Sequence, residues 1–217
     1  MRHKILLGLF ISFGLFLCFY NISIAGPTES VELSVIPRVT YSVVIDTSGA
    51  AIDFGYMAPN EVKWTTGTGA PGNPSTATIR NDGTTTADWQ IRMVPMTGTV
   101  WISTNHAPGN TKDTNGFNKI CLTGILTPLT TSAAQINNNS FDSGYSDIID
   151  GEFRNMGQNG DFAGGDGSTS GKNNGNNVAA GDGRILWLRM KSASDTSVTS
   201  QQKFRIEIRA MPSDTFE

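Results

Sequence analysis

The feature that most constrains this chain is a strict alternation of apolar and charged residues close to its C-terminus. In residues 203–210, KFRIEIRA, Phe204, Ile206 and Ile208 would point to one side of an extended chain, while the residues between them are charged. A helix would place some of those charges on its buried face, whereas a strand with one face in water accommodates all of them. The alternation therefore predicts a strand of an antiparallel sheet.

Residues 184–190, RILWLRM, are apolar on both faces, which is typical of a central strand. The polar residues 192–202 that follow are few enough for a simple connection. We expect the two C-terminal strands to run antiparallel, joined by a hairpin or by a crossing between sheets. Other candidate strands are Val31–Val35, Arg38–Ile45, Ala51–Phe54, Ser75–Arg80, Ala87–Val94, Thr99–Ile102 and Lys119–Leu122.

Turn-forming residues separate these candidates. Because Asn and Gly tolerate positive φ, Asn81-Asp82-Gly83 predicts a turn between the strands at 75–80 and 87–94. Residues 130–150 are expected to hold only a short helical turn. The predicted fold class is all-β: a single immunoglobulin-like or jelly-roll-like β-sandwich with about eight to ten strands and long polar loops.

The N-terminus has the three parts of a secretory signal peptide. A short basic region precedes the apolar residues 5–20, and Ser23-Ile24-Ala25 places small residues before Gly26. The apolar run is shorter than the about 20 residues that span a membrane. We therefore predict a cleaved signal peptide at 1–25 and a single domain at 26–217. The expected location is extracellular or at the cell surface, with the periplasm as the alternative.

Charge and cysteine content exclude further classes. The chain has 16 Lys and Arg, two of them in the leader, against 19 Asp and Glu, which argues against a nucleic-acid partner. No second apolar run is present to span a membrane after cleavage. Beyond the leader, Cys121 is the only cysteine, so an internal disulfide is excluded. We expect a buried apolar residue on a strand, with an intermolecular disulfide or reactive thiol as the alternatives.

Residues 51–60, AIDFGYMAPN, followed by residues 77–83, ATIRNDG, resemble the immunoglobulin-like modules of secreted bacterial surface proteins. In those modules a DFG-type stretch and a proline turn precede a strand that ends in N-x-G. The C-terminal strand pair is similar, more remotely, to biofilm-fibre and pilin-like sandwiches. Asn60 departs from the pattern, which usually has glycine there, and residues 64–74 lengthen the connection. The resemblance implies a surface location and a sandwich fold without a catalytic role.

Histidine and cysteine offer little for catalysis. His106 is the only histidine beyond the leader, and it lies in the turn-rich loop NHAPGN. No G-x-S-x-G motif accompanies it, as a serine hydrolase of that type would require. A cysteine on an apolar strand has no evident access to it, and a zinc site needs more His or Cys ligands than these.

Carboxylates are the remaining catalytic candidates, since glycosidases need only two. Asp142, Asp147, Asp150 and Glu152 lie close together in the sequence. The alternative interpretation is a set of solvated or turn-capping acids, in which residues 147–150, DIID, form a loop that covers an edge of the core with two apolar anchors.

Residues 159–183, NGDFAGGDGSTSGKNNGNNVAAGDG, have the composition of a calcium loop, a linker or an insertion. The EF-hand template fails at Ala163, and the repeated nonapeptide of calcium-binding β-helices fails at Thr169. We therefore predict a flexible Gly/Asn-rich insertion at about 155–183. No cofactor is expected, with calcium as the alternative.

Trp64 and Trp101 adjoin loops and are the candidate ligand-binding residues, whereas Trp89 and Trp187 fit strand cores. Asn138 begins an Asn-Asn-Ser glycosylation pattern. The expected function is a secreted, non-catalytic structural or adhesive surface protein, such as a fibre, matrix or surface-layer component. Its partner would be itself or another surface protein. The alternative is a carbohydrate-binding module with a glycan partner, and the third hypothesis is a glycoside hydrolase using the Asp142–Glu152 acids.

Overall fold

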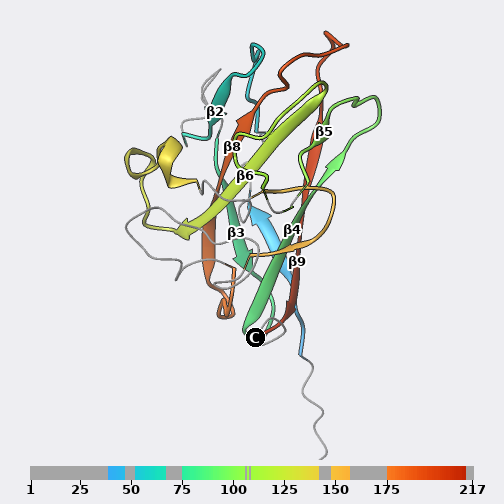
Figure 1. Ribbon diagram of the computed structural model, residues 1–217. Helices are drawn as coiled ribbons and strands as arrows, with labels where there is room; N and C mark the ends of the chain where they lie inside the picture. The colour runs from blue at the N-terminus through green and yellow to red at the C-terminus, as the bar shows by residue number, and fades with distance from the viewer. Residues whose placement is uncertain are drawn as a thin grey trace, which may run out of the picture. The chain divides into compact units, whose positions relative to one another are not determined.

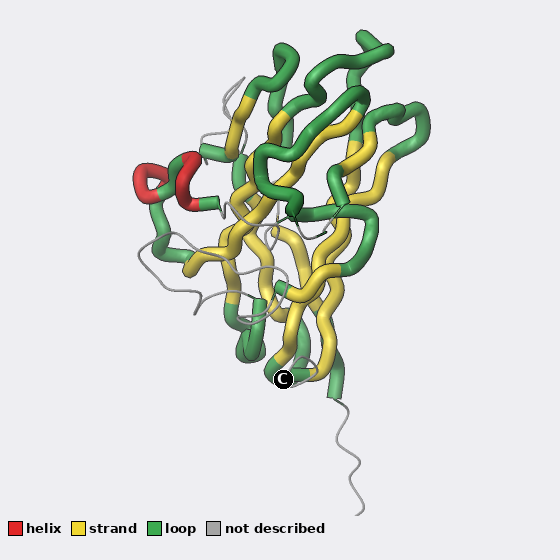
Figure 2. The backbone as a smooth tube through the Cα atoms, in the orientation of Figure 1, coloured by secondary structure: helices red, strands yellow, loops and turns green. Residues whose placement is uncertain are grey.

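The computed structural model describes residues 39–46, 52–66, 75–105, 107, 109–141, 148–156 and 175–213. All of them belong to one compact unit (Figures 1 and 2). The described residues form nine strands: β1 (Val43–Asp46), β2 (Val62–Trp64), β3 (Ala77–Asn81), β4 (Ala87–Pro95), β5 (Ile102–Ser103), β6 (Lys119–Pro128), β7 (Arg154–Asn155), β8 (Gly183–Lys191) and β9 (Phe204–Pro212). Two short 3₁₀ helices, η1 (Ala133–Gln135) and η2 (Asn138–Ser140), follow β6.

The strands form two sheets. The larger has the order β1-β3-β8-β6-β5, and β2 also pairs with β8; the smaller has the order β7-β4-β9. Pairing is antiparallel everywhere except between β5 and β6. Because β3 pairs with residues 183–186 of β8 and β2 with residues 189–191, the two short strands follow one another along the same edge of β8.

The main core lies between the sheets and follows from the period-two alternation of the long strands. Trp89, Ile91 and Met93 of β4 face Leu186 and Leu188 of β8 in one cluster of buried side chains. Trp89 and Ile91 have no exposed surface. The all-β sandwich predicted from the alternation is confirmed, and so is the burial of Trp89 and Trp187.

A second apolar cluster covers the outer face of the larger sheet. It contains Ile125 of β6, Trp187 of β8, and Ile136 and Phe141 from the segment around the 3₁₀ helices. The indole N–H of Trp187 donates to Thr127 Oγ1 at 2.7 Å. β8 is therefore buried on both faces, which explains its apolar sequence and confirms its prediction as a central strand.

The predicted strands at 75–80, 87–94, 184–190 and 203–210 match β3, β4, β8 and β9 closely. The prediction at 51–54 is wrong, since residues 52–54 are not in a strand; Gly55 has a φ of 64° and turns the chain there. β6 extends to Pro128, well past the expected end, and β5 shares only Ile102 with the strand expected at 99–102. The prediction at Val31–Val35 lies outside the described residues.

Two predicted connections cross between the sheets. The turn at Asn81-Asp82-Gly83 leads from β3 in the larger sheet to β4 in the smaller. The Asn81 side chain holds it, because its oxygen accepts from the Gly83 N–H and its amide donates to the Thr85 and Val178 carbonyls. Residues 192–202 likewise lead from β8 to β9, which settles the expected alternative in favour of a crossing.

Asn60 has a φ of 59°, in the left-handed region that favours glycine. Asparagine is among the few other residues that tolerate this conformation, which accounts for its presence where the resembling modules have glycine. The Asn60 N–H donates to Ala193 O at 3.1 Å, so the turn is held against the end of β8.

The described residues at both ends of the insertion expected at about 155–183 are hydrogen-bonded to β4. The Met156 N–H donates to Trp89 O, and the Trp89 N–H donates to Gly175 O. Val178 is fully buried and exchanges both backbone hydrogen bonds with Ala87. A Cβ at Gly175 would lie 2.8 Å from the Met156 Cβ and 2.9 Å from the Trp89 Cβ, so the close approach requires glycine. Residues 157–174 lie outside the described part.

Candidate functional site

The two tryptophans predicted to bind a ligand lie in separate places. Trp64 ends β2, is partly buried, and packs against the outer cluster of the larger sheet. Trp101 precedes β5, packs against the main core, and donates its indole N–H to Thr196 Oγ1 at 2.8 Å. Each ring therefore supports a different part of the core, and the two are not brought together on one cluster.

Of the four candidate acids, Asp142 and Asp147 lie outside the described residues. Asp150 is 4% exposed. Its two oxygens accept from Arg154 Nε at 3.1 Å and Arg154 Nη2 at 2.8 Å, and its Oδ1 also caps the Glu152 N–H. Glu152 itself is exposed. Asp150 is thus held in an ion pair beside β7 and acts there as a turn-capping group.

The segment before Asp150 has the anchoring role that its sequence predicts. Ile148 and Ile149 are both fully buried. Ile148 forms a bridge with Thr123 of β6, and the Ile149 N–H donates to Leu122 O at 2.8 Å. The segment therefore covers the sandwich beside β6 with two apolar anchors.

Cys121 is buried on β6, as predicted, and is a free thiol. Its Sγ donates to Thr111 O at 3.3 Å. Burial raises the pKa of the Cys121 thiol to about 12, so it is protonated at neutral pH. His106, the other half of the hypothetical thiol–imidazole pair, lies outside the described residues.

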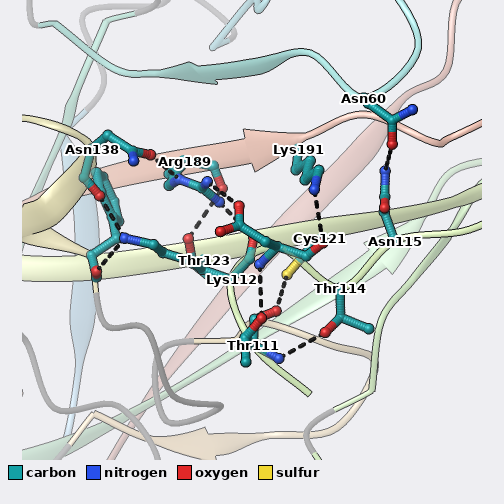
Figure 3. A network of polar contacts seen from close by, with 12 residues as sticks. Asn60, Thr111, Lys112, Thr114, Asn115, Cys121, Thr123, Asn138, Arg189 and Lys191 are labelled. Atoms are coloured by element: carbon teal, nitrogen blue, oxygen red, sulfur yellow. Dashed lines mark hydrogen bonds and ion pairs between the residues drawn. The ribbon is translucent and has the colours of Figure 1, made fainter. Parts of the chain in front are cut away.

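The densest polar cluster is one that sequence reasoning does not identify. It lies on the outer face of the larger sheet, where the segment 111–115 crosses β6 and β8 (Figure 3). At its centre is Arg189 of β8, whose side chain is 1% exposed. Its Nε donates to Asn138 Oδ1 at 2.7 Å, its Nη1 to Lys112 O at 2.5 Å, and its Nη2 to Asp113 Oδ1 at 2.5 Å. All three nitrogens of the guanidinium group are thus satisfied.

Lys112 is the second buried cation, with 8% of its surface exposed. Its Nζ donates to the backbone carbonyls of Asn138, at 2.9 Å, and Phe141, at 3.1 Å. Asn138 therefore accepts from both cations, with its side chain from Arg189 and with its backbone from Lys112. This arrangement ties η2 and the 111–115 segment to the sheet and engages the oxygen of the asparagine that begins the glycosylation pattern.

Asp113 is the carboxylate within this cluster, and its side chain is 50% exposed. Partial burial acts to raise the pKa of the Asp113 carboxyl, but the hydrogen bond and charge of Arg189 outweigh it and hold that pKa below its usual value. Lys191 adds to the effect, and its Nζ donates to Asp113 O at 3.0 Å. One carboxylate thus lies among three cations.

A smaller polar group lies on the outer face of the smaller sheet. Arg92 of β4 donates through Nε to Glu207 of β9 at 2.8 Å, and the Phe153 ring lies 4.3 Å from Arg92 Cζ and 4.1 Å from Arg209 Cζ. The hydrogen bond from Arg92 is the main cause that lowers the pKa of Glu207. The Phe153 ring therefore contacts two guanidinium groups, which links the segment next to β7 with both long strands.

Neither cluster resembles a catalytic centre. Within the part of the chain that the structure describes, no group of three or more His, Cys, Asp and Glu side chains could hold a metal ion. The buried cations already have acceptors, and the buried thiol is protonated. The polar contacts of the two clusters can hold loops on the outer faces of the sheets. Arg189 could have been suspected from sequence, since it is a charge in a strand that is apolar on both faces, but Lys112 and Asp113 carry no such pattern.

No family model, curated protein or solved structure matches this chain. No helix among the described residues is long and apolar enough to cross a membrane.

Proposed function

We propose that this protein is a secreted, non-catalytic structural component of a cell surface or extracellular matrix, which assembles with copies of itself or with another surface protein. The signal-peptide pattern at residues 1–25 supports export. A structural role is supported by the polar contacts that fasten the segments around Lys112 and Asn138 to the larger sheet.

One observation carries this proposal: the described side chains that are most able to take part in chemistry are bonded to other groups of the protein. Arg189 and Lys112 are buried against backbone and amide oxygens, and Asp150 is paired with Arg154. The Cys121 thiol is buried and hydrogen-bonded to a carbonyl. An enzyme keeps such groups pointed at a substrate, whereas here they fix segments far apart in the sequence onto one sheet.

The first experiment follows the full chain with its own leader in a bacterial host. We expect the protein outside the cytoplasm, with Gly26 as the first residue of the mature chain. The control carries Leu9→Arg, which interrupts the apolar part of the leader and should keep the protein inside the cell. Retention of the unaltered chain in the cytoplasm would contradict the proposal.

The second experiment compares assembly with binding. The purified mature chain should form larger species as its concentration rises, measured by sedimentation and electron microscopy. It should show no glycan-array binding that depends on Trp64 or Trp101, with Trp64→Ala and Trp101→Ala as the comparison. A chain that binds a glycan and loses that binding in either variant would favour a carbohydrate-binding module instead.

A further inference from the structure

The outer face of the smaller sheet carries a surplus of positive charge. Arg92 of β4 and Arg205 and Arg209 of β9 point outward, because they alternate with residues of the same strands that pack in the main core. Two acids share this orientation. Glu207 lies among the arginines, whereas Asp88 is fully buried. At this surface three cations therefore accompany one carboxylate, in a chain that has more acidic than basic residues.

These cations are accessible and lie along a strip of the sheet. The side chain of Arg205 is 63% exposed and that of Arg92 is 36% exposed, and Arg209 is also exposed. Arg205 and Arg209 are about 13 Å apart along β9, at about 3.3 Å per residue. Arg92 lies opposite Glu207, midway between them, on the adjacent strand β4 (Figure 1). The charges are spread out, which favours an extended ligand over a single small anion.

Contacts that cross all three strands hold two of the guanidinium groups in place. Arg209 Nε donates to Gln90 Oε1 at 2.6 Å, and Gln90 Nε2 donates to Asn155 Oδ1 at 2.6 Å. The Phe153 ring contacts the guanidinium groups of both Arg92 and Arg209. Side chains that are positioned before a ligand arrives lose less conformational entropy when it binds. The face is therefore prepared for binding by its own network.

Glu207 shows which chemistry the arginines accept. Its Oε2 accepts from Arg92 Nε at 2.8 Å, and its Oε1 lies 2.8 Å from Arg205 Nη2. The planar guanidinium group presents its N–H donors in a geometry that matches the two oxygens of a carboxylate. Because Glu207 balances only one of the three positive charges, the face retains an attraction for carboxylates from outside the chain.

The centre of this face is polar, which argues against a protein or a membrane as the partner. Gln90 and Arg92 lie opposite Arg209 and Glu207 there. Stable protein interfaces have an apolar or aromatic core, and proteins that lie on membranes insert apolar side chains. The Phe153 ring is already in contact with two guanidinium groups. A polar, positively charged strip instead fits a polymer with repeated negative charges.

We propose that the outer face of the smaller sheet binds the carboxylate groups of an anionic polysaccharide, with Arg92, Arg205 and Arg209 as the contacting residues. Carboxylates that recur along one polymer engage several arginines at once, which strengthens binding beyond that of any single pair. The acidity of the rest of the chain opposes this little, since exposed charges are screened beyond about 8 Å at physiological ionic strength. The inference goes beyond the proposed function, because it adds a partner that is not a protein.

The test measures binding of alginate fragments to the purified mature chain by titration calorimetry, with dextran as the neutral comparison. Alginate should bind and dextran should not, and added salt should weaken the binding because it screens exposed charges. Arg205→Gln and Arg209→Gln should each weaken alginate binding by about fivefold. The two together should weaken it by about 25-fold, because separated sites act additively.

Arg80→Gln is the matched control. Arg80 is exposed on β3 of the larger sheet, so the substitution removes the same charge from a different surface. It should change alginate binding by less than about twofold, since screening limits the effect of distant charges. The melting temperature of each variant checks that the sandwich is folded before binding is compared.

Chemical modification locates the site without any substitution. Phenylglyoxal reacts with accessible guanidinium groups, and mass spectrometry identifies the arginines that it modifies. Alginate should protect Arg205 and Arg209 from modification and leave Arg80 as reactive as before. Equal protection of all three, or of none, would contradict the proposed surface.

Other outcomes would also overturn the inference. They are an absence of alginate binding at physiological salt, and an equal loss of binding from Arg80→Gln and Arg205→Gln, which would indicate a general charge effect. Tighter binding to poly-glutamate, or to vesicles that contain phosphatidylglycerol, would replace the polysaccharide by an acidic protein or a lipid surface. Failure of export or of assembly would count against the proposed function alone, because the purified chain can still be tested for polysaccharide binding.

Discussion

Arg189 is the residue on which the outer face of the larger sheet most depends, because its guanidinium group reaches three separate segments. It contacts Asn138 in η2, and Lys112 and Asp113 in the segment that crosses the strands. A buried cation is stabilising only while its acceptors stay in place, since an isolated one would carry a large desolvation cost. Arg189 therefore holds the segments that contain Asn138 and Lys112 on the outer face of the larger sheet.

Arg189→Met should lower the free energy of unfolding by about 2–4 kcal/mol, because it leaves three buried or partly buried acceptors without their donor. Chemical denaturation measures the loss. Arg80→Met, at an exposed position on β3, is the matched control and should change stability by less than about 0.5 kcal/mol. Equal effects of the two substitutions would show that the guanidinium contacts contribute nothing.

The Asp113 carboxylate should make the free energy of unfolding depend on pH in the acid range. Its pKa in the folded chain lies below the usual value, so its contribution is present above the unfolded-state pKa of about 4 and is lost as the pH falls through the folded value. We expect Asp113→Asn to reduce stability at neutral pH and to flatten the acid side of the stability profile. The effect should be smaller than that of Arg189→Met, because half of the Asp113 side chain is exposed and screened by water. An unchanged acid profile would contradict this.

Cys121 should be almost inert in the folded protein. With a thiol pKa of about 12, its thiolate fraction at pH 8 is roughly a thousandfold lower than that of an ordinary cysteine. A colorimetric thiol reagent should therefore react slowly with the native chain and at the normal rate in denaturant. Rapid reaction in the native state would show that the thiol is accessible and would revive an intermolecular disulfide as a mode of assembly.

At the scale of elements, the turn between β3 and β4 joins several parts of the two sheets. The β3–β4 turn contacts both the residues that precede β1 and the chain that precedes β8: Thr84 N–H donates to Thr40 O, and Asn81 N–H donates to Asp182 O. One turn thus fixes the entry of the chain, the end of β3 and the start of β8.

Gly83→Ala tests that close packing. A Cβ at Gly83 would lie 2.4 Å from Thr40 O, a backbone atom that cannot move without displacing the chain before β1. We expect a loss of about 1–3 kcal/mol in the free energy of unfolding. Gly151→Ala is the control, because nothing lies within 4 Å of a Cβ there; its effect should be within about 0.5 kcal/mol. A neutral Gly83→Ala would mean that the turn adjusts freely.

Different parts of the segment between β7 and β8 should contribute differently to the stability of the fold. The Gly175 N–H donates to Met156 O at 2.6 Å, so the residues on either side of 157–174 are already adjacent. Replacing residues 159–172 by a short Gly-Ser link should leave the melting temperature nearly unchanged, since loop closure depends weakly on length. Extending the deletion through Val178 should destabilise the fold strongly, because it removes a fully buried side chain and the bonds to Ala87. A large loss from the shorter deletion would contradict this division.

At the scale of the whole molecule, one strand joins most of the larger sheet. β8 pairs with β2, β3 and β6, and its two faces contribute to both apolar clusters. The smaller sheet depends in the same way on β4, which pairs with β7 and β9. The remaining strands hold their places largely through these two.

Periodicity predicted the long strands because burial on one or both faces determines which positions along a strand are apolar. Short strands carry no such pattern: β2 and β7 are strands because β8 and β4 lie beside them. The second half of β6 contains Gly124 and Pro128, which in sequence favour a turn, and only its pairing with β8 keeps it extended. The cluster around Arg189 depends on contacts between residues more than 50 positions apart, which a single sequence does not reveal.

The position of β8 and β9 in the sequence also governs when the molecule can fold. β2, β3 and β6 can pair with β8 only after residues 183–191 have been synthesised. β4 likewise can pair with its only long partner, β9, only after residues 204–212 have been synthesised. Most pairings of the larger sheet, and nearly all of the smaller one, therefore form only once the final part of the chain has been synthesised. Under the proposed export, this late pairing would leave most strands without partners while the chain is still being synthesised, as passage through a narrow channel requires.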